Sequence, residues 1–157
     1  MIRVALWIVG PPAAGKTTLA RTLLSFDACS VLGTVKLIER PKWTVCLDGL
    51  AVGAGHYTGH TFDGADRVPY NGVRPALEYW LDHLRERAAL TVFDGDRFSH
   101  RSAVDFVRPH VDRVEVRYID ATPDELEARR TARGWAANPQ WLKGRETKAK
   151  RFAELFK

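Results

Sequence analysis

The sequence is poor in cysteine and contains no long apolar run. Two cysteines among 157 residues are too few for the disulfide framework of a small secreted protein. No apolar run approaches the roughly 20 residues that a membrane-spanning helix needs. The first strand-like segment begins close to residue 1 and leaves no room for a signal peptide. We therefore expect a protein of the reducing cytoplasm.

Internal repeats, linkers and low-complexity segments are missing as well. Hydrophobic residues make up 45% of the chain, and a chain of this length can bury a core of its own. We expect a single domain over residues 1–157, in which residues 129–157 form a lid and a basic C-terminal helix.

Acidic residues are scarce in the last part of the chain. Residues 129–157 contain nine Lys and Arg but two Asp and Glu, a net charge of +7, whereas residues 1–128 have a net charge of −2. This basic segment is expected to face phosphate groups, either of a nucleotide or of a nucleic acid. A solvated basic helix over the last ten residues is the alternative.

A nucleotide-binding motif lies close to the N-terminus. The pattern G-x-x-x-x-G-K-[ST] is matched by Gly10, Pro11, Pro12, Ala13, Ala14, Gly15, Lys16 and Thr17. An apolar run over Val4–Val9, typical of a strand buried on both faces, precedes the motif. Leu19, Leu23 and Leu24 follow it at helical spacing. Such a turn surrounds an anion with unpaired backbone N–H groups at the positive end of a helix dipole.

The residue types in the motif predict the ligands. Lys16 would reach the β- and γ-phosphates of a nucleoside triphosphate, and the hydroxyl of Thr17 would bind Mg²⁺. Thr18 extends the phosphate-binding turn into the helix. We therefore expect ATP and Mg²⁺ as cofactors.

Strand-like and helix-like segments alternate along the chain. Strands are expected over residues 4–9, 31–39, 42–47, 90–93 and 114–119, with Arg40-Pro41 joining the second and third. Helices are expected over residues 18–24, 75–88, 99–108, 122–133 and 138–156. Residues 48–71 lack periodicity and are expected to form a long functional loop. The alternation predicts an α/β fold with a mostly parallel sheet, helices on both faces, and ligands beyond the carboxyl ends of the strands.

Acidic residues follow the strand predicted over residues 90–93. Asp94 stands where a P-loop protein carries the carboxylate that holds Mg²⁺ or its water shell. Asp96 is a candidate base for an acceptor hydroxyl, and Arg97 a clamp for phosphate or substrate. A plain turn after a strand is the alternative. Asp48 and Asp66 are further candidate acids.

Arg129 and Arg133 are four residues apart and share a face of the helix predicted over residues 122–133. Like charges at this spacing repel unless an anion lies between them. Arginines can stabilise the charge that develops when a γ-phosphoryl group is transferred, so we expect a lid over the triphosphate. The alternative is an exposed basic helix end, stabilised by the helix dipole.

Residues 10–18, residues 94–97 and the arginine-bearing helix resemble the small P-loop kinases of the nucleoside and nucleotide kinase group. A narrower resemblance is to the 5-hydroxymethyluracil DNA kinases of bacteriophages that hypermodify thymidine. It rests on Gly55-His56-Tyr57-Thr58-Gly59, Asp63-Gly64-Ala65-Asp66-Arg67, Phe93-Asp94-Gly95-Asp96-Arg97 and Asn138-Pro139-Gln140-Trp141-Leu142-Lys143-Gly144-Arg145-Glu146-Thr147-Lys148. The resemblance implies a three-layer P-loop kinase fold and transfer of phosphate from ATP to the hydroxymethyl group of a base in DNA.

The residues themselves are compatible with a nucleic-acid acceptor. The glycine-rich residues 53–72 could admit a base that has left its stack, and the candidate contacts there are His56, Tyr57, Asp66 and Arg67, with the aromatic Phe62 and Tyr70. The candidates in the basic segment are Trp135, Trp141, Lys143 and Lys148 for the acceptor, and Arg145 for the triphosphate. Tryptophans that cover a core are the alternative. His56 and His60 lack cysteine partners nearby, and we predict no zinc site.

Two other classes of function stay open. A kinase of a free nucleoside, a nucleotide or a small hydroxylated metabolite needs the same acid and arginines but no basic segment. A nucleotide-dependent switch without kinase activity needs no acceptor site. The long segment over residues 48–71 favours an acceptor pocket and therefore a kinase.

Overall fold

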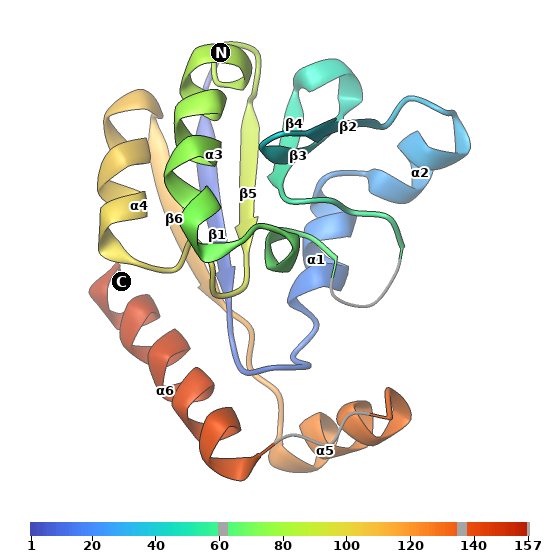
Figure 1. Ribbon diagram of the computed structural model, residues 1–157, viewed down its shortest axis with the longest axis vertical. Helices are drawn as coiled ribbons and strands as arrows, with labels where there is room; N and C mark the ends of the chain where they lie inside the picture. The colour runs from blue at the N-terminus through green and yellow to red at the C-terminus, as the bar shows by residue number, and fades with distance from the viewer. Residues whose placement is uncertain (60–62, 135–137, 157) are drawn as a thin grey trace.

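The protein folds around one mixed β-sheet, seen in a computed structural model that describes residues 1–59, 63–134 and 138–156 (Figure 1). The strands are β1 (Val4–Val9), β2 (Lys36–Glu39), β3 (Lys42–Cys46), β4 (Ala51–Ala54), β5 (Leu90–Asp94) and β6 (Arg113–Tyr118). The helices are α1 (Lys16–Leu23), α2 (Phe26–Val31), α3 (Val73–Tyr79), α4 (Arg101–Val107), α5 (Pro123–Ala132) and α6 (Pro139–Leu155). A π-helical turn over Trp80–Leu84 extends α3.

The six strands have the order β2-β3-β4-β5-β1-β6. β1 lies between β5 and β6 and is parallel to both, and β4 is parallel to β5. β2 and β3 form an antiparallel hairpin through Arg40-Pro41, and β3 also pairs antiparallel with β4. The prediction of an α/β fold with a mostly parallel sheet is confirmed.

Side chains of β1 pack alternately into two apolar clusters. Trp7 belongs to the cluster that contains Val104 of α4 and Phe152 of α6, whereas Ile8 belongs to the cluster that contains Ala20 of α1. Helical residues therefore pack against both sides of β1. This placement explains the continuous apolar run in the sequence, because neither face of the strand meets water.

The strand predicted over residues 31–39 is wrong in its first half. Val31 ends α2 and is 88% exposed, and the strand β2 begins at Lys36. Gly33 ends the helix with a φ of 70°. Its N–H bonds to the carbonyl of Ser30, and the N–H of Thr34 bonds to the carbonyl of Cys29, which is the Schellman pattern of a helix end.

The absence of regular structure predicted for residues 48–71 is also wrong, because β4 lies inside this segment and is buried throughout. Its residues are Ala-Val-Gly-Ala, of which only Val52 has a high β-propensity. Packing explains the small side chains: a Cβ on Gly53 would lie 2.8 Å from Leu24 and 2.9 Å from Tyr57. Tertiary contacts therefore decide the structure of this strand.

The predicted helix starts near the C-terminus are confirmed. Thr122 and Glu125 form a reciprocal capping box before α5, and Asn138 accepts from the N–H groups of Gln140 and Trp141 at the start of α6. Figure 1 shows α5 and α6 beyond the carboxyl end of β1. No helix among the described residues is both long and apolar enough to cross a membrane.

Candidate functional site

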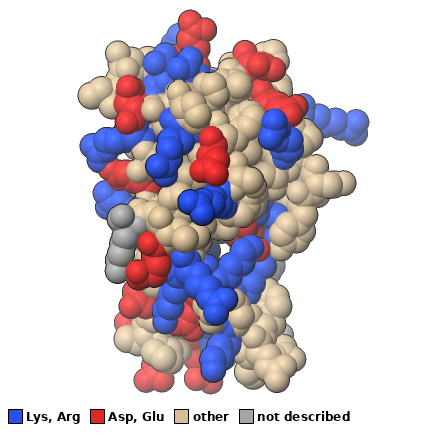
Figure 2. All heavy atoms as spheres, turned by 90° about the vertical axis from the view of Figure 1, so that its left-hand side faces the viewer, with Lys and Arg blue, Asp and Glu red and all other residues tan. Residues whose placement is uncertain are grey.

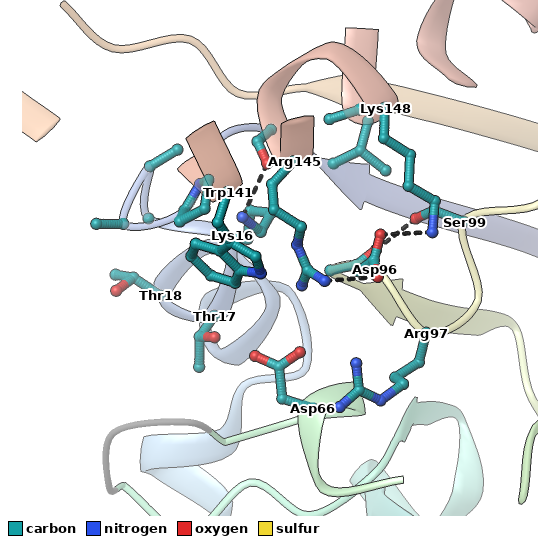
Figure 3. A pocket seen from close by; sticks show the side chains of 18 of the residues that line it. Lys16, Thr17, Thr18, Asp66, Asp96, Arg97, Ser99, Trp141, Arg145 and Lys148 are labelled. Atoms are coloured by element: carbon teal, nitrogen blue, oxygen red, sulfur yellow. Dashed lines mark hydrogen bonds and ion pairs between the residues drawn. The ribbon is translucent and has the colours of Figure 1, made fainter. Parts of the chain in front are cut away.

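A cavity of about 500 Å³ opens where the parallel strands end. The turn between β1 and α1 forms one wall, and Asp66, Asp96 and Arg97 form the wall opposite (Figure 3). The start of α6 covers the remaining side with Trp141, Arg145 and Lys148. The structure thus brings together predicted site residues from five separate parts of the sequence.

The turn after β1 depends on its two glycines. Gly10 approaches the end of β6 so closely that a Cβ would lie 2.5 Å from the carbonyl oxygen of Ile119. Gly15 has a φ of 98°, a left-handed conformation that a side chain would strain. Lys16 then begins α1 and folds back over the turn, where its ammonium group donates to the carbonyls of Gly10 at 3.0 Å and Pro11 at 2.9 Å. Burial lowers the pKa of Lys16, although Asp66 and Asp94 act in the opposite direction.

Asp94 ends β5 beside this turn. Its Oδ2 lies 3.3 Å from the hydroxyl oxygen of Thr17, and its Oδ1 accepts from the hydroxyl of Tyr57 at 2.6 Å and the N–H of Ala65 at 2.9 Å. Two donors therefore hold the carboxylate so that its second oxygen faces Thr17. Burial raises the pKa of Asp94 to about 6, and the two hydrogen bonds to Oδ1 limit the rise.

Thr17 and Asp94 together match the ligands that a protein typically contributes to a Mg²⁺ site. Magnesium typically takes one or two carboxylates, and its other ligands are water and substrate phosphates. Among the described residues, no group of three or more His, Cys, Asp and Glu side chains could hold a metal ion. Thr17 and Asp94 could therefore supply only part of the ligands that such an ion needs.

A close contact between Gly55 and Gly64 fixes the segment that carries Tyr57 and Ala65, the two donors to Asp94. A Cβ on Gly55 would overlap the carbonyl of Gly64, and a Cβ on Gly64 would lie 2.5 Å from Oδ1 of Asp94. Tyr57 is fully buried, and the Nε2 of His56 lies 2.7 Å from the carbonyl oxygen of Ile38. The structure therefore places His56 and Tyr57, two candidate substrate contacts, inside the protein and outside the cavity.

Asp96 is held by cations of α6. Its carboxylate accepts from Arg145 at 2.9 Å and from Lys148 at 2.7 Å, and the hydroxyl of Tyr70 donates to it at 3.2 Å. Burial would raise the pKa of Asp96, but the contacts with Lys148 and Arg145 outweigh burial and lower it. Asp96 is thus an ionised group with its oxygens already engaged.

Asp66 differs from Asp96 in having no such partner. Its exposed carboxylate lines the cavity and makes no hydrogen bond or ion pair with another residue in the described ranges. It acts on the pKa of Lys16 through its charge. Of the candidate acids in the cavity, Asp66 is the one free to accept a proton from a bound molecule.

The remaining basic and aromatic candidates lie on the rim of the cavity or, like Arg129, beside it. Arg129 donates to the carbonyl of Ala13 at 3.2 Å, and Arg133 lines the cavity directly. The guanidinium of Arg97 donates to Val68 and lies 3.9 Å above the ring of Tyr70. Trp141 is 43% exposed at the opposite side of the rim.

Three candidates lie elsewhere. Asp48 precedes β4 at the opposite end of the sheet, where it pairs with Arg87 at 2.5 Å. Arg67 lies 3.5 Å from Asp63, and Lys143 lines a neighbouring groove. Phe62 and Trp135 lie outside the described residues.

Sequence reasoning missed two groups at the site. The N–H of Ala65 bonds to Asp94, and the side chain of Ser99 lines the cavity. A backbone donor has no residue-type signal, so no pattern could have revealed Ala65. Ser99 falls at the start of the helix predicted over residues 99–108, and its position three residues after Asp96 is the signal that could have revealed it.

The cavity therefore combines a phosphate-type turn, a hydroxyl–carboxylate pair, a free carboxylate and several cations. This combination stands without support from relatives, because no protein-family model and no curated protein matches the sequence.

Proposed function

We propose that the protein is an ATP-dependent kinase with a three-layer P-loop kinase fold, which transfers the γ-phosphoryl group of ATP to a hydroxyl group. The observation that carries the proposal is the pairing of Thr17 with Asp94 at 3.3 Å beside the glycine turn. A hydroxyl and a carboxylate in this relation are what a P-loop enzyme uses to hold Mg²⁺ on the phosphates.

The cations around the cavity suit the triphosphate. Lys16 lies over the turn, and Arg133 and Arg145 approach from α5 and α6. Bound Mg²⁺, held by Thr17 and Asp94, would neutralise charge on the phosphates. Such preorganised charges stabilise a transferring phosphoryl group without covalent help from the protein.

The free carboxylate of Asp66 suits the acceptor. In the proposed step, the acceptor oxygen forms a bond to the γ-phosphorus while the bond to the bridging β,γ-oxygen breaks and ADP leaves. The proton of the acceptor hydroxyl passes to Asp66. Asp96 is less suited to this task, because Arg145 and Lys148 already occupy its oxygens.

We propose the hydroxymethyl group of 5-hydroxymethyluracil in DNA as the acceptor, in line with the resemblance to phage DNA kinases. Two observations support a base as the group that enters. Tyr70 is 62% exposed and Trp141 is 43% exposed, and both line the cavity, where aromatic rings can stack on an extruded base. The surrounding arginines and lysines suit the phosphates of a DNA strand.

Phosphorylation of an oligonucleotide is the direct test. With γ-labelled ATP and Mg²⁺, we expect label on a single-stranded oligonucleotide that contains 5-hydroxymethyluracil, and none on the matched oligonucleotide with thymidine. Label on the free nucleoside or another small molecule, with none on DNA, would instead identify a metabolite kinase. ATP hydrolysis without any labelled acceptor would identify a nucleotide-dependent switch.

Gly64→Ala is expected to lower phosphoryl transfer by about tenfold or more, because the new Cβ would push Asp94 from its position 2.5 Å away. Gly59→Ala is the matched control: Gly59 also has a positive φ, 89° against 78°, but among the described residues its Cβ would meet nothing closer than Arg21 at 3.8 Å. Both variants carry strain from a positive φ, but a Cβ on Gly64 would also lie 2.7 Å from the hydroxyl of the buried Tyr57, so the melting temperature of Gly64→Ala should fall further. Activity is therefore compared well below both melting temperatures. Equal activity of the two variants would show that the contact with Asp94 is unimportant.

A further inference from the structure

A second hollow, of about 680 Å³, lies between the start of α4 and the outer side of α6. Its charged lining consists of Arg101, Lys143, Lys148 and Arg151, with no carboxylate. Ser99 and Lys148 line both this α4/α6 groove and the candidate active site, so the two hollows adjoin. A molecule bound along the groove would therefore reach the rim of the cavity at Ser99 and Lys148.

Three of the cations in the α4/α6 groove have no acidic partner. Arg101, Lys143 and Arg151 are exposed and form no ion pair with any residue in the described parts of the chain. Lys150, on the same helix, is by contrast paired with Glu146 at 2.9 Å. Unpaired cations that share a hollow raise its positive potential and attract an anionic partner.

The cations follow one another along the helix and do not converge on one point. Lys143, Thr147 and Arg151 are spaced four residues apart and form one stripe, so the two cations are about 12 Å apart along the helix axis. Figure 2 faces the side of the molecule that carries α4 and α6, and shows Lys and Arg side chains gathered over its lower half. Such a row suits a series of phosphates better than a single one.

We propose that the α4/α6 groove binds the sugar–phosphate backbone of the acceptor DNA strand beside the target nucleotide. The strand passes Ser99 and Lys148 as it enters the cavity, and the exposed Leu155 offers an apolar contact for a neighbouring base. This inference rests on the proposed function and identifies where the polymer part of its substrate is held.

The test compares two double variants with equal loss of charge. Lys143→Gln/Arg151→Gln removes two cations of the groove, and Lys150→Gln/Arg113→Gln removes two cations that are ion-paired to Glu146 and Glu115 outside it. Binding of a labelled single-stranded oligonucleotide with one 5-hydroxymethyluracil is measured by anisotropy over a range of salt concentrations. Binding of labelled ATP is measured in parallel.

The groove variant should bind the oligonucleotide at least about tenfold more weakly, and its salt slope should be shallower by roughly 1.4, since each single-strand phosphate contact contributes about 0.7. The control variant should bind within about twofold of the wild type, and both should bind ATP normally. Equal losses in the two variants, or an unchanged salt slope, would overturn the proposal. So would binding of phosphatidylserine vesicles without binding of the oligonucleotide.

The groove and the proposed function can fail separately. Oligonucleotide binding with the expected salt dependence, but no phosphate transfer to it, would refute the function and retain the groove. Phosphate transfer with an unchanged KM for the oligonucleotide in the groove variant would refute the groove and retain the function.

Discussion

Lys16→Ala is expected to abolish phosphoryl transfer, with a loss of at least about 100-fold, because it removes a positive charge from the bridge between the β- and γ-phosphates. The fold should remain intact. Within the part of the chain that the structure describes, the ammonium group of Lys16 bonds only to the carbonyls of Gly10 and Pro11 in its own turn. Burial lowers its pKa, so the charged group is a cost to the folded state and its removal should not lower the melting temperature.

The matched control is Lys36→Ala, which removes an exposed lysine from the edge strand β2. It should retain wild-type turnover of γ-labelled ATP and the wild-type melting temperature. Normal turnover in Lys16→Ala would refute the nucleotide-binding role of the turn, and with it the proposed kinase.

Asp94→Asn is expected to reduce phosphoryl transfer by about 100-fold or more, since a carboxylate at a catalytic metal is typically worth that much. Asparagine can still accept from Tyr57 and Ala65 through its carbonyl oxygen, so the loss would come from the missing charge at Thr17. Asp82→Asn, an equal change at an exposed position after α3, should leave turnover unchanged. Near-normal transfer by Asp94→Asn would refute the proposed role of this carboxylate beside Thr17.

The same substitution should stabilise the protein. The pKa of Asp94 is raised to about 6 by burial, so the folded state binds a proton more readily than the unfolded state. Above the raised pKa the buried charge costs up to about 3 kcal/mol, and this cost disappears as the pH falls through 6 toward the ordinary value near 4. Denaturant unfolding with a metal chelator should therefore find Asp94→Asn more stable than the wild type near pH 8, and equally stable near pH 4. A variant less stable than the wild type at both pH values would contradict this account.

Segments with strong local signals were predictable from the sequence. The apolar run of β1 and the capping box of Thr122 and Glu125 each specify their structure through neighbouring residues. β4 could not be predicted from its sequence Ala-Val-Gly-Ala, because the glycine at its third position is required by the close approach of Leu24 and Tyr57 to Gly53. The prediction was wrong at Val31, which has a high β-propensity but forms the last residue of α2, just before the helix end at Gly33.

The proximity of residues that follow two neighbouring parallel strands was predictable from the sequence. Thr17 and Asp94 could be paired in advance because the strand order of an α/β sheet brings their strand ends together. The burial of Tyr57 could not be foreseen, because the hydrogen bond to Asp94 spans 37 residues and depends on the contact between Gly55 and Gly64. The ion pairs that distinguish Asp96 from Asp66 are likewise hidden in the sequence, since they arise from the approach of α6.

The ion pairs of Asp96 give the proposed kinase an internal competitor for its own nucleotide. Arg145 and Lys148 pair with the carboxylate of Asp96 at 2.9 Å and 2.7 Å. A triphosphate that takes these cations must first displace the carboxylate, so its affinity is the difference between two sets of ion pairs. Before ATP binds, the carboxylate of Asp96 reduces the repulsion between Arg145 and Lys148. The same ion pairs weaken the binding of the nucleotide, because they must be broken first.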